Sequence, residues 1–226
     1  QELENQLHLA AKTYWRVLQL EGDQPIPNAA ETNLGLARVH YEWNNLEAAE
    51  RYGQRSLQLA RQYDRAIGRF IICEVFLARL KLAQGDVAGA AAVLAQTDRA
   101  ARQQNFVQRM PDIAAVQVLT LLRQSDVAAA AQLTQIYDLP ISLARVYLAQ
   151  RDSTAALTIL EPLRQQLEAK GWQDERLKVM VLQAVALHAH GEKDQAVRVL
   201  HEAMTMAEPG GFIRIMYIAP GIDSPF

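Results

Sequence analysis

The stretch at residues 35–50 reads GLARVHYEWNNLEAAE and carries the pattern that decides the fold. Its turn residue, Asn44, is followed by the amide of Asn45, and alanines stand seven positions before the turn, at Ala37, and five positions after it, at Ala49. An amide at this place can cap the next helix, and alanines allow two helices joined by a tight turn to approach closely. The stretch therefore predicts a helical hairpin.

The same pattern recurs four more times along the chain. The further turn residues are Gly85, Ser125, Arg151 and Gly191, and an acidic residue follows each of them. Starting from Asn44, each turn residue lies 41, 40, 26 and 40 residues after the one before it. A compact residue precedes each turn by seven positions and an alanine follows it by five; these anchors are Ala78, Val118, Ala144 and Ala184 before the turns, and Ala90, Ala130, Ala156 and Ala196 after them. Apolar residues between the turns keep the spacing i, i+3, i+4 and i+7. The sequence thus predicts an all-α array of helical hairpins with about eleven helices.

The expected helices follow from this periodicity. A leading helix at 2–21 and a loop at Glu21–Asn28 precede hairpins at 29–63, 65–104, 107–137, 139–170 and 173–208. Pro111 fits only a first helical turn, whereas Pro162 should bend the helix that it interrupts. The 26-residue interval leaves room for only two short helices around residues 137–140.

The helical period ends after Gly211. Residues 212–218 read FIRIMYI, an apolar run without helical spacing, so the sequence predicts a repeat domain at 1–208 and a short extended tail or linker at 209–226. Because a terminal repeat must shield its apolar side, we expect this run to cap the last hairpin; pairing as a strand with a partner is the alternative.

Composition excludes several classes of protein. The 226 residues include 23 basic and 25 acidic side chains, a formal net charge of −2, so there is no overall basic field for nucleic acid. No apolar run approaches the roughly 18 residues of a membrane span, and no signal peptide is present. The single cysteine, Cys73, lies among apolar residues and is expected to be a buried, inert thiol. We therefore expect a cytoplasmic protein, and the start at Gln1 without methionine indicates a piece of a larger one.

Two stretches resemble a known family. The turn-plus-alanine spacing is similar to the tetratricopeptide repeat, and residues 35–50 together with AEPGGFIRI at 207–215 resemble the helical repeat region of MalT-class, LuxR-family transcription regulators of bacteria. The resemblance implies a right-handed superhelix of hairpins that binds an effector, flanked in the parent protein by an ATPase and a helix-turn-helix domain. The 226-residue sequence itself contains no Walker motif and no recognition helix, so we expect that it neither hydrolyses ATP nor contacts DNA directly. Because the sequence departs from the family pattern after Ile215, it stays open whether a DNA-binding domain follows Phe226 in the parent protein.

The groove of such a superhelix is where partners usually bind. As the resemblance implies, groove residues are those just after the compact residue of each first helix and three or four positions further on. The candidates are Arg38, Tyr41, Glu42, Arg79, Arg123, Arg145 and His188. The guanidinium groups of arginines can bind carboxylates, phosphates or sugar hydroxyls through paired hydrogen bonds. Tyr41 beside Glu42 would suit a carbohydrate. In the alternative interpretation, the arginines pair with neighbouring acids, and Tyr41 and Trp43 are core residues.

No arrangement of residues predicts catalysis or a metal centre. His188 and His190 point to different sides of a helix, the other histidines have no companion cysteines, and no nucleophile has a recognisable signature. We expect a non-catalytic sensor and interaction region without a cofactor, which binds a small effector or a regulatory protein. The alternative is a protein-protein scaffold or self-association module, docking a peptide or a second copy with no small effector.

Overall fold

The computed structural model describes residues 6–20, 28–63 and 68–217, and within these ranges the chain forms eleven α-helices and no strand. These elements belong to two compact units. The N-terminal unit is Leu9–Asp126, and the C-terminal unit is Val127–Phe226 together with Gln1–His8. None of the described helices has the length and hydropathy needed to cross a bilayer.

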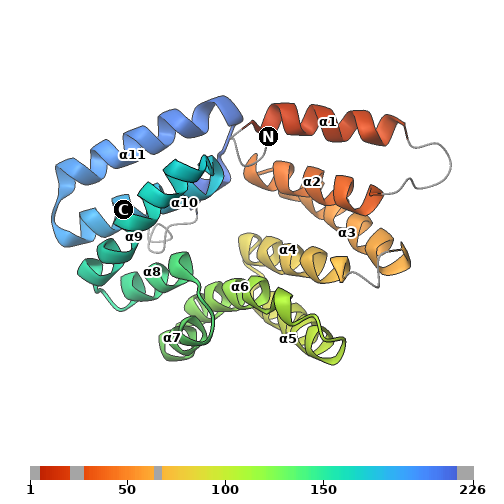
Figure 1. The fold of residues 1–226 in the computed structure, drawn as a ribbon, viewed down its shortest axis with the longest axis horizontal. Helices are drawn as coiled ribbons and strands as arrows, with labels where there is room; N and C mark the ends of the chain where they lie inside the picture. Colours follow the sequence, from red (N-terminus) through yellow and green to blue (C-terminus); the bar gives the residue numbers. More distant parts are fainter. Residues whose placement is uncertain (1–5, 21–27, 64–67, 218–226) are drawn as a thin grey trace. The chain divides into compact units, whose positions relative to one another are not determined.

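The N-terminal unit is a run of antiparallel helices, each packed on the next from α2 to α6 (Figure 1). The first helices of successive hairpins also touch, since α4 contacts both α2 and α6. The elements are α1 (Leu7–Gln19), α2 (Ala29–Glu42), α3 (Leu46–Tyr63), α4 (Arg69–Ala83), α5 (Val87–Gln103), the 3-10 helix η2 (Val107–Arg109) and α6 (Met110–Arg123).

The C-terminal unit continues the same pattern, with each helix from α7 to α11 packed on the next and α8 also on α10. Its helices are α7 (Val127–Ile136), α8 (Pro140–Ala149), α9 (Ser153–Lys170), α10 (Gln173–His190) and α11 (Lys193–Ala207). Leu160, Val179 and Leu182 form part of its buried core. With ten residues each, α7 and α8 are the two short helices that the 26-residue interval predicts.

All five predicted turns are confirmed. Each turn residue has a positive φ, between 57° and 97°, which is the left-handed conformation that ends a helix. The residue after it donates its backbone N–H to a carbonyl at the end of the first helix, as in Asn45 to His40 at 2.8 Å and Asp152 to Tyr147 at 2.9 Å. This is the Schellman arrangement, and it satisfies carbonyls that a helix end would otherwise leave open.

Three of the predicted caps form, at Asn45, Asp86 and Asp152, whereas Glu192 makes no side-chain cap hydrogen bond at the start of α11. The Asp86 carboxylate accepts the Gly89 N–H at 2.8 Å, and Asp152 accepts the Ala155 N–H at 2.9 Å. Every anchoring alanine is buried: Ala37, Ala49, Ala78, Ala90, Ala130, Ala144, Ala156, Ala184 and Ala196. Small buried residues on both sides of a turn are what two closely packed helices require.

The two prolines considered in the sequence analysis, Pro111 and Pro162, lie within helices. Pro111 occupies the first turn of α6, as predicted, where its missing N–H has no intrahelical partner to lose. Pro162 lies inside α9, which continues from Ser153 to Lys170 without ending at it. Most of the expected loop at 21–28 and the first residues of the leading helix lie outside the described residues.

The prediction of an extended tail is wrong for the described residues. After α11 the chain forms two short 3-10 helices, η3 (Glu208–Gly210) and η4 (Arg214–Tyr217), and η4 packs against α10. Gly211, at φ 69°, reverses the chain, and Phe212 and Ile215 become buried. An extended segment without a partner strand leaves its backbone groups unpaired, whereas folding back buries the apolar run. These two residues therefore cover the last hairpin, and residues 218–226 lie outside the described part.

A buried carboxylate joins three helices of the N-terminal unit. One oxygen of Glu74 in α4 accepts a hydrogen bond from Arg61 of α3 at 2.6 Å, and the other accepts one from Thr97 of α5 at 2.8 Å. Nearby, the Sγ of Cys73 lies 3.2 Å from the Ser56 hydroxyl, and burial raises the pKa of this thiol. Cys73 is fully buried, as the sequence predicts.

Aromatic rings join α1, α2 and α3. His40 stacks on Tyr52 with ring centroids 5.4 Å apart and meets Trp43 edge-on at 5.6 Å, while Trp15 of α1 meets Tyr52 edge-on at 5.5 Å. Both ring nitrogens of His40 are buried without a hydrogen-bond partner among the described residues. Burial, and then the positive charge of Arg51, lower the pKa of His40 below 6.5.

The turn geometry predicts that Arg151→Gly stabilises the protein. Arg151 is exposed and has φ 62°, a conformation that a side chain disfavours and glycine adopts freely. We expect an increase of up to about 1 kcal/mol in the free energy of unfolding, measured by urea denaturation. The control is Gln150→Gly, one residue earlier at φ −79°, which should destabilise by about 0.5 to 1 kcal/mol. Equal effects of the two glycines would contradict the prediction.

The lowered pKa of His40 predicts a loss of stability in acid. Above pH 6.5 the ring is neutral in both folded and unfolded chains; as the pH falls below 6.5, the unfolded chain binds a proton that the folded chain resists. The free energy of unfolding should therefore decrease until the pH passes the folded-state pKa. Urea denaturation at several pH values should give a smaller decrease in His40→Phe, which keeps an aromatic ring but cannot titrate. An unchanged pH dependence in this variant would rule out His40 as its source.

Candidate functional site

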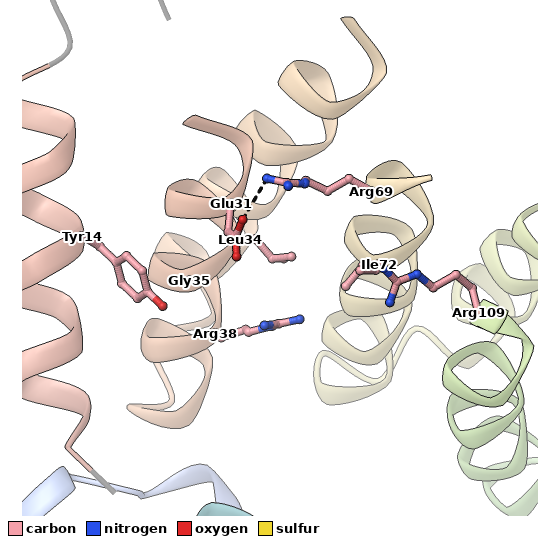
Figure 2. A pocket seen from close by; sticks show the side chains of 8 residues that line it. All are labelled: Tyr14, Glu31, Leu34, Gly35, Arg38, Arg69, Ile72 and Arg109. Atoms are coloured by element: carbon pink, nitrogen blue, oxygen red, sulfur yellow. Dashed lines mark ion pairs between the residues drawn. The ribbon is translucent and has the colours of Figure 1, made fainter. Parts of the chain in front are cut away.

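The N-terminal unit contains a pocket of about 240 Å³ lined by three arginines (Figure 2). Its walls come from α1, α2, α4 and η2, so successive hairpins contribute to one site. The lining residues are Tyr14, Glu31, Leu34, Gly35, Arg38, Arg69, Ile72 and Arg109. All of them lie within the N-terminal unit.

One face of α2 forms the middle wall. Glu31, Leu34 and Arg38 follow one another at spacings of three and four residues, which place side chains on the same side of a helix. Leu36 and Val39 point elsewhere and are fully buried, so α2 packs through its other faces. Helical periodicity therefore presents one carboxylate, one apolar side chain and one guanidinium to the pocket.

Gly35 allows α1 to close the pocket on one side. In Figure 2 the Tyr14 ring of α1 points toward α2 at Gly35. A Cβ at residue 35 would overlap atoms of this ring, so only glycine permits the approach in its present form. The small residue thus places a phenol at the edge of a site that is otherwise lined by arginines.

The three arginines differ in their partners. Arg69 of α4 forms an ion pair with Glu31 at 3.0 Å, and its side chain is 18% exposed, against 66% for Glu31. Arg109 lies 3.7 Å from Asp112, and its buried Nε has no hydrogen-bond partner among the described residues. Arg38 is exposed and forms no ion pair with any described residue. Carboxylates of the described residues therefore neutralise only part of the positive charge of the three arginines.

Of the residues predicted to line a groove, the pocket contains Arg38. Arg79, one repeat further along, is half-buried on α4 and does not line it, and Arg123 is exposed at the end of α6. Tyr41 is buried, with its ring 5.9 Å from that of Phe76. Tyr41 is thus a core residue, as the alternative interpretation states.

The remaining candidates are not among the residues that line the pocket. Glu42 is half-buried at the end of α2. In the C-terminal unit, Arg145 of α8 is buried, 6% exposed, and His188 is exposed in the last turn of α10. Of the predicted set, Arg38 is the residue that lines the pocket.

Sequence reasoning missed Arg69 and Arg109, although a repeat signal was present. Both stand nine positions before a compact anchor residue, which is Ala78 for Arg69 and Val118 for Arg109. Glu31 could also have been found, because it lies two turns before Arg38 on the same helical face. No local pattern indicates Tyr14, which reaches the pocket through the packing of α1.

The comparison with family models agrees with this architecture. A family model described as the MalT-like TPR region matches residues 1–219, nearly the whole chain. Among curated proteins, none matches the chain. Among solved structures, the chain is similar to a crystal structure of nearly identical TPR-like repeats from a putative kinesin light chain of Podosopora anserina. That likeness has 20% sequence identity and a TM-score of 0.47, and it covers 80% of this chain and 96% of the other.

The match of the family model also agrees with the hairpins of the structure. Five left-handed turns, each followed by a buried alanine five residues later, are the repeat signature that the sequence predicts. The chain belongs to the family of MalT-like tetratricopeptide-repeat regions.

Proposed function

We propose that this chain is the non-catalytic sensing region of a LuxR-type transcription regulator and that it holds a small effector in the arginine-lined pocket. The observation that carries the proposal is the convergence of Arg38, Arg69 and Arg109 on one cavity of about 240 Å³. A concave site with a few convergent polar groups is the usual form of a small-molecule site. In the proposed parent protein, an ATPase and a helix-turn-helix domain flank this region.

The pocket offers a direct way to convert binding into a change of repeat packing. Arg38 belongs to α2, Arg69 to α4 and Arg109 to η2, so one ligand can contact three successive hairpins at once. A ligand that binds one arrangement of these hairpins better than another shifts the population toward that arrangement. Flanking domains respond if that shift changes their own contacts with the repeats.

The pocket predicts an effector-dependent stabilisation that requires Arg38. Thermal unfolding should be measured against oligosaccharides, nucleotides, amino acids and organic acids. A ligand at about 100 times its Kd adds about 2.7 kcal/mol, which raises the midpoint by about 5 to 10 °C for a chain of this size. Arg38→Ala should abolish the increase, because it removes a guanidinium from the pocket wall.

The matched control is Arg79→Ala, which changes the equivalent position of the next repeat outside the pocket. It should keep the full increase. An increase that survives in Arg38→Ala would overturn the assignment of the pocket. If no compound raises the midpoint and a specific protein binds instead, the alternative of a protein-protein scaffold replaces the sensor.

The contact between Tyr14 and Gly35 predicts that Gly35→Ala damages the pocket. The added methyl group would displace the Tyr14 ring, so we expect a loss of about 1 to 3 kcal/mol in the free energy of unfolding. Urea denaturation of Tyr14→Ala and of the double variant completes the cycle. Once the ring is removed, Gly35→Ala should cost little, and additive losses would show that the two residues do not interact.

A further inference from the structure

The charges that line the pocket do not balance. Arg38, Arg69 and Arg109 bring three guanidinium groups, and Glu31 brings the single carboxylate among the lining residues. Asp112 lies outside the lining but pairs with Arg109 at 3.7 Å, so one positive charge is left over locally in a chain whose formal net charge is −2. Like charges gathered in a concave site raise the local concentration of ions of the opposite sign. The pocket is thus suited to an anion rather than to a neutral molecule.

The shape of the pocket restricts the anion. Its volume of about 240 Å³ has room for about eight water molecules at about 30 Å³ each. Leu34 and Ile72 add apolar surface beside the arginines. Guanidinium groups bind carboxylate and phosphate oxygens through paired hydrogen bonds. A small organic acid or phosphate ester fits these walls better than a long neutral oligosaccharide.

Glu31 already occupies one arginine. Its carboxylate lies 3.0 Å from Arg69, but its own side chain is 66% exposed, so it can turn into solvent once another anion pairs with Arg69. Because one partner is this exposed, solvent screens the pair, and it adds less stability than a buried pair. The Arg69 side chain is 18% exposed and keeps its place at the pocket wall. A carboxylate or phosphate of a ligand can therefore take the position of Glu31 at small cost.

We infer that the effector of this pocket is a small carboxylate- or phosphate-bearing molecule and that its anionic group competes with Glu31 for Arg69. The inference rests on the proposed function, because it names the chemical class of the effector of that same pocket. Binding exchanges a contact between α2 and α4 for contacts of both helices with the ligand. Glu31 thus lowers the affinity for the anion by competing with it, and it links occupancy of the pocket to the packing of two hairpins.

The test compares charged compounds with neutral ones of the same size. Isothermal titration of the full chain should use succinate against succinamide, and glucose 6-phosphate against glucose. We expect at least one charged compound to bind more than about tenfold more tightly than its neutral counterpart, since only the charged one forms paired hydrogen bonds with the guanidinium groups. Succinate alone indicates a carboxylate effector, and glucose 6-phosphate alone indicates a phosphate ester. Binding should weaken as salt rises, because the charges lie near solvent.

Variants of opposite sign then test the competition. Glu31→Gln should strengthen binding of the charged compound by about two- to fivefold, because it removes the internal competitor. Arg38→Gln should weaken binding by about tenfold or more, and Arg79→Gln, outside the pocket, should leave it unchanged. Circular dichroism should show equal helix content in all three variants.

Three results overturn the inference. The first is that neither charged compound binds more tightly than its neutral counterpart; if a neutral compound binds and requires Arg38, the proposed function stands and only the anionic class is wrong. The second is that Glu31→Gln weakens binding or leaves it unchanged, which contradicts the competition. The third is that binding of the charged compound is the same in Arg38→Gln and Arg79→Gln, which removes the pocket from both proposals.

Discussion

The left-handed turn between two closely packed helices is the constraint on which the rest of the structure depends. In each hairpin a single residue with positive φ ends the first helix, and the next residue closes a hydrogen bond back to that helix. The alanines before and after the turn are buried, so the helices on both sides can approach each other. Because this geometry recurs with nearly constant spacing, each first helix in the N-terminal unit shows an equivalent face to its neighbour.

The pocket is a consequence of this equivalence. Arg69 and Arg109 occupy the same repeat position in successive hairpins, and Arg38 lies on the neighbouring first helix. Repetition therefore brings like charges together, which is unfavourable for the protein alone. Glu31 relieves part of that repulsion by its ion pair with Arg69, while Arg38 has no such partner among the described residues. An arrangement that is only partly neutralised without a ligand is the form expected of a binding site for anions.

The surroundings of the pocket hold it in place. Tyr14 closes one side over Gly35, and the rings of Trp15, Tyr52 and His40 join α1, α2 and α3 in the same unit. The hydrogen bonds that Glu74 accepts from Arg61 and Thr97 join α3, α4 and α5. These contacts use rigid rings and satisfied hydrogen bonds, so the helices that carry the arginines are anchored by neighbours on several sides.

The sequence by itself determined the hairpins, because each depends on interactions within a few residues: the turn at Asn44, the cap at Asp86 and the buried alanine at Ala37 are all read from local spacing. It also singled out Arg38, which lines the pocket, since one helical face follows from the period of 3.6 residues. Only the tertiary structure decided which arginines meet, because Tyr14, Arg69 and Arg109 come from segments far apart in the chain. The same holds for Tyr41, which is drawn into the core by Phe76, and for residues 212–217, which fold back because α10 offers an apolar surface to cover. Local spacing specifies an element, but burial and charge at a site depend on what the rest of the chain packs against it.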